Sequence, residues 1–160
     1  MKKIFIFTTL FGSLFVSKSY SQDSTQQKQL SQLLSRYYNI KDALVAGNSN
    51  TASGEAKEFI KTANSIDYKL ISEGNINALL KDATPISDTK DIDKQRQHFA
   101  TLSNNMATLA KAVKLSPDTI YQAYCPMKKA SWLSNNKAIK NPYYGNAMLT
   151  CGEIKETIGQ

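Results

Sequence analysis

The sequence predicts a mostly α-helical fold, an antiparallel helical bundle with an irregular, aromatic-rich C-terminal cap. Three long stretches repeat apolar residues every three or four positions, which is typical of helices that bury one face. The last third instead mixes tyrosines and the single tryptophan with Asn, Pro and Gly, without a sustained helical stripe. Three amphipathic helices must bury their apolar faces against one another, and an antiparallel bundle does this with short connections.

The first 21 residues have the three-part pattern of a secretory signal peptide. Two lysines precede an apolar run from residue 4 to 16, and the small residues Ser19 and Ser21 precede an expected cleavage before Gln22. This apolar run is shorter than the roughly 20 residues that span a bilayer. We therefore expect export to the periplasm, one helical domain over residues 22–160, and no membrane span after signal cleavage.

Three long helices are expected near residues 28–46, 52–72 and 88–114. Gly47 and Gly74 end the first two, because glycine is common just after the C-terminus of a helix. Each stretch carries one apolar stripe at helical spacing. The stripes are Leu30, Leu33, Leu34, Tyr37, Ile40 and Leu44; Ala52, Ala56, Phe59, Ile60, Ala63, Ile66 and Leu70; and Ile92, Phe99, Leu102, Met106, Leu109 and Val113.

Two shorter helices are expected between and after the long ones. Residues 75–81 can form one before Pro85, because the residue preceding a proline is pushed away from helical geometry. Residues 117–123 can form another, since proline suits the first position of a helix. The segment that follows is expected to be an irregular cap with Cys125 and Cys151 at its two ends.

Composition and motifs exclude several function classes. Without the three lysines of the leader the formal net charge falls from +7 to +4, and the remaining lysines do not form the basic stripe that binds nucleic acid. His98 is the only histidine, and the metalloprotease, Walker, nucleophile-elbow and dinucleotide-binding motifs are absent. A cysteine nucleophile with His98 as its base would need a free thiol in an oxidising compartment. We therefore expect neither an enzyme nor a nucleic-acid-binding protein.

Sulfur side chains gather in two short clusters of the last third. Cys125 and Met127 form one cluster, and Met148 and Cys151 form the other. Thiolate and thioether sulfur prefer soft ions such as Cu(I) and Ag(I), so the two clusters together indicate a metal site. His98 is a further candidate ligand, because imidazole also suits copper. In an exported protein the same two cysteines are suited to one disulfide, worth roughly 3 kcal/mol, and both interpretations stay open here.

The chain also resembles a known family, a bacterial periplasmic domain of unknown function that occurs alone or fused to the C-terminal end of copper/silver-efflux membrane-fusion adaptors. The resemblance covers nearly all of the chain after the leader. It rests on residues 37–45 (YYNIKDALV), 95–103 (QRQHFATLS), 124–127 (YCPM), 132–134 (WLS), 141–145 (NPYYG) and 148–152 (MLTCG). It implies a helical domain associated with copper handling, and it marks His98, Cys125, Met127, Met148 and Cys151 as the positions to test.

Two functions of different classes are therefore expected. In the first, the protein is a periplasmic heavy-metal module that binds or delivers copper or silver through the Cys/Met clusters, with Cu(I) as its cofactor and a metal-efflux protein as its partner. In the second, it is a disulfide-closed, metal-free interaction domain whose aromatic cap docks onto another envelope protein. A count of free thiols in protein purified without reductant distinguishes the two.

Overall fold

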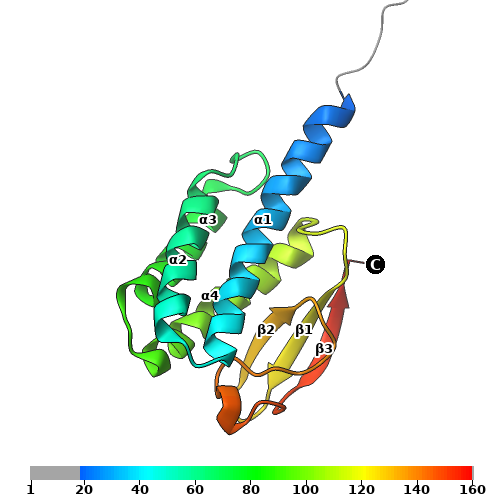
Figure 1. The fold of residues 1–160 in the computed structure, drawn as a ribbon. Coiled ribbons are helices and arrows are strands. Elements are labelled where there is room, and N and C mark those ends of the chain that lie inside the picture. The colour runs from blue at the N-terminus through cyan, green and yellow to red at the C-terminus, as the bar shows by residue number, and fades with distance from the viewer. Residues whose placement is uncertain (1–18, 160) are drawn as a thin grey trace, which may run out of the picture.

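The computed structural model describes residues 19–159, with side chains from residue 24 onward. Four helices and a three-stranded antiparallel sheet make up this part of the chain (Figure 1). The side chains of the expected signal peptide, residues 1–21, lie outside it. Among the described helices, none combines the length and the apolar character needed to cross a membrane.

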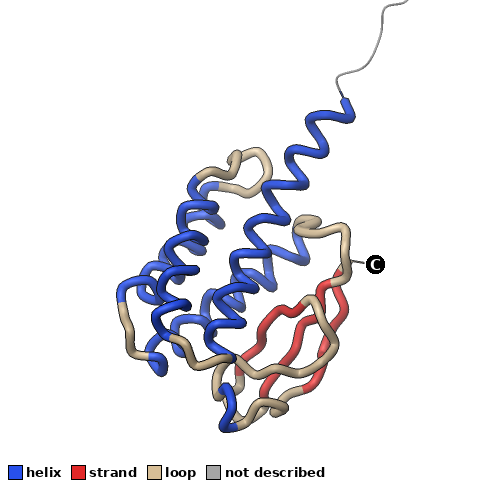
Figure 2. The backbone as a smooth tube through the Cα atoms, in the orientation of Figure 1, coloured by secondary structure: helices blue, strands red, loops and turns tan. Residues whose placement is uncertain are grey.

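The helices confirm the prediction of a mostly α fold. They are α1 (Ser19–Val45), α2 (Ser49–Asn64), α3 (Glu73–Asp88) and α4 (Ile92–Ala112). Each packs against the next along the chain, and consecutive helices run in opposite directions (Figures 1 and 2). The side chains of Asn48, Ser72 and Asp91 accept backbone N–H groups in the first turns of α2, α3 and α4. These caps satisfy donors that a helix N-terminus leaves without an intrahelical partner.

α2 is shorter than the helix expected over residues 52–72. It ends at Asn64, because the backbone N–H and the hydroxyl of Ser65 both turn back to carbonyls of the last helical turn. Asp67 then accepts the backbone N–H of Lys69 at 2.9 Å and closes a turn. Side chains that compete for backbone groups in this way favour turns over helix.

α3 is longer than the short helix expected over residues 75–81, because it continues through Pro85 to Asp88. A proline inside a helix removes one hydrogen bond and costs about 3 kcal/mol or more. Ile86, the residue after the proline, is fully buried on the same face as Leu79. Burying such side chains contributes about 1.5–3 kcal/mol each, so packing keeps the chain helical past the proline.

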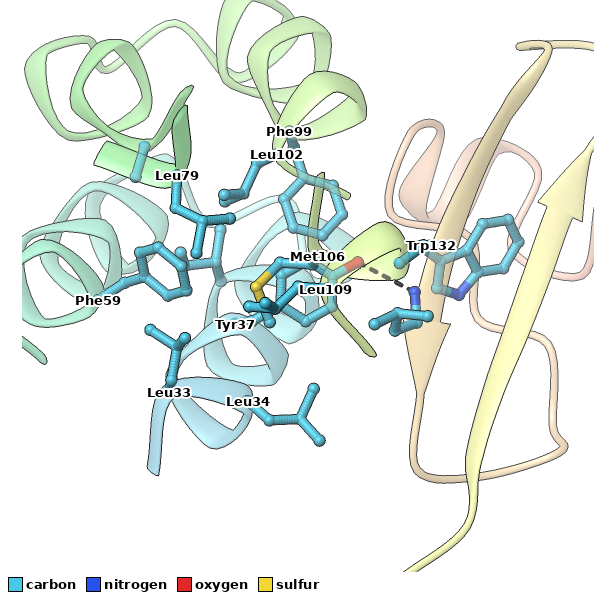
Figure 3. Close-up of a cluster of buried hydrophobic side chains, with 14 of the residues drawn as sticks. Leu33, Leu34, Tyr37, Phe59, Leu79, Phe99, Leu102, Met106, Leu109 and Trp132 are labelled. Atoms are coloured by element: carbon cyan, nitrogen blue, oxygen red, sulfur yellow. Dashed lines mark hydrogen bonds between the residues drawn. The ribbon is translucent and has the colours of Figure 1, made fainter. Parts of the chain in front are cut away.

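The hydrophobic core lies among the four helices and reaches the sheet (Figure 3). Its large side chains come mainly from the predicted stripes and are at most 1% exposed: Leu33, Tyr37, Phe59, Leu79, Phe99, Leu102 and Met106. The thioether of Met106 is therefore core packing, as expected for an unbranched apolar side chain on a helix stripe. The amphipathic pattern located this core correctly.

A sheet occupies the region where an irregular cap was expected. β1 (Ile120–Cys125) lies in the middle and pairs antiparallel with β2 (Ala130–Ser134) and with β3 (Glu153–Ile158). The helix expected over residues 117–123 is thus wrong, since half of that segment is strand. Aromatic residues favour strands, but neither β1 nor β2 alternates regularly between buried and exposed positions. The period-2 signal that identifies a strand is therefore missing from both.

Four aromatic rings connect the helices with the sheet. Tyr37 stacks on Phe99 with ring centroids 5.2 Å apart, Tyr143 lies 6.1 Å from Phe99, and Trp132 lies 6.0 Å from Tyr143. The hydroxyl of Tyr37 also accepts the backbone N–H of Leu133 in β2 at 3.0 Å (dashed in Figure 3). α1, α4, β2 and the connection between β2 and β3 therefore share one packed unit.

Candidate functional site: a paired thiol at the end of the sheet

The two cysteines lie in contact at one end of the sheet. Cys125 is the last residue of β1, and Cys151 lies two residues before β3. The pairing of β1 with β3 sets Tyr124 opposite Glu153 and so brings the adjacent cysteines together. Their Sγ atoms are 3.1 Å apart. A disulfide bond measures about 2.05 Å, so the structure contains two thiols in contact and no bond between them.

Cys125 sits in an environment that stabilises its thiolate. Its side chain is fully buried, and burial alone raises the pKa of a thiol. A hydrogen bond from the Cys151 thiol opposes this effect. The backbone N–H groups of Lys128 and Met127 and the side-chain amide of Asn141 lower the pKa of this thiol further. Together the hydrogen bonds prevail, and the pKa of Cys125 lies below its ordinary value.

Cys151 has the opposite character. Its side chain is partly exposed, and the pKa of its thiol is raised, chiefly because it donates a hydrogen bond to Cys125. The first proton to leave the pair therefore leaves from Cys125, and the remaining proton stays on Cys151. The sequence offered no means of distinguishing the two cysteines, because the distinction comes from burial and from backbone donors.

Asn141 organises the segment that carries Cys151. The residue is fully buried, and its amide nitrogen donates to the carbonyl oxygen of Cys151 at 2.7 Å. The side-chain amide oxygen of Asn141 accepts a hydrogen bond from the backbone N–H of Tyr143 at 2.8 Å. The backbone N–H of Asn141 donates to the carbonyl oxygen of Leu149 at 2.8 Å. In the sequence this position stands out only within residues 141–145 (NPYYG), which contribute to the family resemblance. Nothing in the residue pattern connects it with the cysteines.

Gly152 allows the chain next to Cys151 to pass close to the sheet. Its φ is +146°, and a Cβ atom there would lie 2.7 Å from the Trp132 ring and 3.0 Å from the carbonyl oxygen of Tyr124. Only glycine tolerates both this backbone conformation and this approach. The position of Cys151 beside β1 thus depends on a residue without a side chain.

The two candidate methionines flank the thiols at the surface. Met127 lies in the turn between β1 and β2 and is 66% exposed, and Met148 is 36% exposed. The Met127 backbone N–H points to both sulfur atoms, and the Cys151 N–H donates to the Met148 carbonyl at 3.1 Å. These are backbone contacts. Both methionines are thus close to a cysteine along the backbone, and their side chains are exposed.

His98 does not join the thiols. It lies on the exposed surface of α4, where its charge acts on Asp82 of α3. Within residues 24–159 no three His, Cys, Asp or Glu side chains converge closely enough to hold a metal ion. Of the five residues selected from the sequence, the structure brings the sulfur atoms of Cys125 and Cys151 into contact, leaves the side chains of Met127 and Met148 exposed, and places His98 on α4.

Comparison with known proteins identifies a family but no characterised relative. A family model described as a protein of unknown function (DUF3347) matches residues 33–118. The match begins within α1, continues through α4 and ends before β1, so both cysteines lie beyond it. No curated protein matches the chain, and no solved structure does.

Proposed function

This chain belongs to the DUF3347 family of proteins of unknown function, and from its own residues we propose that it binds a soft monovalent metal ion, Cu(I) or Ag(I), through Cys125 and Cys151. The observation that supports this proposal is the partly buried contact between the two sulfur atoms, which lie 3.1 Å apart. Thiolate sulfur is the protein ligand that such ions prefer.

The thiol pair fits a metal ion with little rearrangement. Metal–thiolate bonds are about 2.3 Å long in zinc sites, so two thiolates on one tetrahedral ion lie about 3.8 Å apart. The Sγ atoms, now 3.1 Å apart, would need to separate by only about 0.7 Å. Cys125 already has N–H donors that support its negative charge, which lowers the cost of losing the proton that a metal must displace.

The exposed thioethers of Met127 and Met148 are the proposed additional ligands. Both side chains reach solvent beside the pair, and methionine is flexible enough to turn toward a bound ion. Thioether is a weaker donor than thiolate, so a site completed by methionines can pass its ion to stronger ligands of a partner. The proposal does not require His98, which lies elsewhere on α4.

The setting that the family resemblance implies completes the proposal. Residues 1–21 would direct export to the periplasm, and the partner would be a metal-efflux protein that receives copper or silver. Binding should weaken as the pH falls, because protons compete with the ion for the thiolates.

A Cu(I) titration of the reduced protein against a chelating competitor tests this function. We expect the wild type to hold one ion, a Cys125→Ser, Cys151→Ser double variant to lose binding, and a Met127→Leu, Met148→Leu double variant to bind more weakly than the wild type. His98→Ala is the matched control and should bind as the wild type does. If the double cysteine variant competes as well as the wild type, the thiol pair is not the site.

The second candidate function is a metal-free interaction domain closed by a disulfide. The same sulfur contact favours it, since oxidation in place would join the end of β1 to the segment before β3. A thiol count on protein isolated from the periplasm without reductant separates the two functions. No free thiol favours the interaction domain, whereas two free thiols favour the metal-binding function.

A further inference from the structure

The two thiols differ sharply in access from solvent. Cys125 is fully buried at the end of the central strand, whereas Cys151 is partly exposed in the segment before β3. The two sulfur atoms are nevertheless in contact at 3.1 Å. A reagent from solution can therefore meet Cys151 more readily than Cys125, and Cys125 lies in contact with Cys151.

We propose that the pair is a thiol–disulfide exchange site, in which Cys151 forms the mixed disulfide with a small-molecule disulfide and Cys125 then resolves it. This activity requires no metal ion. It assigns Cys151 as a site of reversible S-thiolation, and it assigns the buried Cys125 as the internal nucleophile.

Oxidation takes two steps. In the first, the Cys151 thiol loses its proton and its sulfur attacks a low-molecular-weight disulfide RS–SR, whose S–S bond breaks so that one RS⁻ leaves. In the second, the Cys125 thiol loses its proton and its sulfur attacks Cys151, so that the Cys125–Cys151 bond forms, the mixed S–S bond breaks and the second RS⁻ leaves. The dithiol loses two electrons and two protons; the small disulfide gains the electrons, and the protons end on the two released thiols.

The geometry favours attack by Cys125 on the mixed disulfide, so this intermediate should not accumulate. β1 and β3 hold the two sulfur atoms in contact, so resolution is an intramolecular reaction between groups that are already close. Forming the bond requires an approach of about one ångström, from 3.1 Å to about 2.05 Å. The mixed disulfide should therefore be short-lived in the wild type.

Reduction runs through the same sulfur. A thiol from solution meets Cys151 more readily than Cys125, and its attack there makes Cys125 the leaving group. Access decides which sulfur of a disulfide is attacked, so the partly exposed Cys151 fixes the direction of the exchange.

The test uses metal-free protein in the presence of a chelator, with glutathione disulfide as the probe and intact-mass analysis as the readout. We expect wild-type protein to form an internal disulfide without retaining glutathione. Cys125→Ser should retain one glutathione on Cys151. Cys151→Ser should react at least about tenfold more slowly, because the buried thiol of Cys125 reacts only after local opening.

A denatured control separates access from intrinsic reactivity. In denaturant, where neither thiol is buried, the two single variants should react at similar rates, and circular dichroism verifies that both fold without it. The proposal is wrong if folded Cys151→Ser reacts as fast as Cys125→Ser, or if the wild type accumulates the glutathione adduct. Because no metal is present, these outcomes are independent of whether the protein binds Cu(I).

Discussion

Single buried polar side chains join distant parts of this chain, and Gln95 is the clearest example. Its side chain is fully buried at the start of α4. Its amide nitrogen lies 2.9 Å from the carbonyl oxygen of Ser49, 3.2 Å from that of Ile86 and 2.8 Å from that of Thr89. One amide thus connects the start of α2, the end of α3 and the start of α4.

Replacing this amide should destabilise the fold. Gln95→Leu removes the donor from these buried carbonyls, and we expect a loss of about 2–3 kcal/mol in the free energy of unfolding, because each unpaired buried group costs about 1–3 kcal/mol. Gln97→Leu makes the same change on the exposed surface of α4 and should stay within about 0.5 kcal/mol of the wild type. Urea unfolding measures both, and equal effects would show that the Gln95 contacts contribute little.

The cysteine pair allows a second prediction at this scale, concerning its titration. Cys125→Ala should lower the pKa of Cys151 toward the ordinary thiol value of about 8.5, because the hydrogen bond to Cys125 is the main cause of its elevation. Cys151→Ala should raise the pKa of Cys125, which loses a hydrogen-bond donor while its burial remains. Thiolate absorbance measured against pH reports both changes. Unchanged values in both variants would mean that the thiols do not interact.

At the scale of elements, the connection between β2 and β3 is anchored to the helices by Arg96. This α4 side chain donates to the carbonyl of Pro142 at 3.1 Å and to that of Leu44, in the last turn of α1, at 3.2 Å. Gly145 lies against the same group with φ of +53°, and a Cβ atom there would lie 2.6 Å from the Arg96 Nη2 atom and 2.9 Å from the Val45 carbonyl oxygen. The connection can pack here only because position 145 has no side chain.

A pair of glycine substitutions tests this anchor. Gly145→Ala should destabilise the protein by about 2–3 kcal/mol, since it combines a strained backbone with displacement of the Arg96 hydrogen bonds. Gly54→Ala, inside α2 with nothing within 4 Å of the added Cβ, should stabilise it by up to about 1 kcal/mol. Thermal unfolding measures both changes. A Gly145→Ala variant as stable as the wild type would show that the connection can repack without its contact to Arg96.

At the scale of the whole molecule, the aromatic rings make the helices and the sheet mutually dependent. Tyr37 and Phe99 belong to helices, Trp132 belongs to β2, and Tyr143 lies between them in the connection. The sheet has only three short strands, and its edge strand β3 is mostly exposed. Such a sheet has too little core of its own to persist once these contacts are lost.

The molecule should therefore unfold in one transition. Trp132 is the only tryptophan and reports on the sheet, whereas far-UV circular dichroism reports mainly on the four helices. The two signals should give coincident urea transitions, as two-state behaviour requires. A fluorescence transition at clearly lower urea concentration than the dichroism transition would show that the sheet unfolds independently.

The sequence by itself determined the buried faces of the long helices and the proximity of the two cysteines. Apolar residues spaced about 3.6 positions apart fall on one side of a helix, so these stripes specify which face is buried. Examples are Leu33, Tyr37 and Leu44 in α1 and Phe99, Leu102 and Met106 in α4. The proximity of Cys125 and Cys151 was also predictable, since they stand at the two ends of one segment.

Only the tertiary structure decided the rest of the fold and the character of the site. β1 lies between β2 and β3, and its buried and half-buried positions lack the alternation that identifies a strand. α3 passes through Pro85 because long-range packing outweighs a local preference. The contrast between Cys125 and Cys151, the role of Asn141 and the separate position of His98 arise from burial and backbone donors contributed by residues distant in the chain, and no local pattern encodes those contacts.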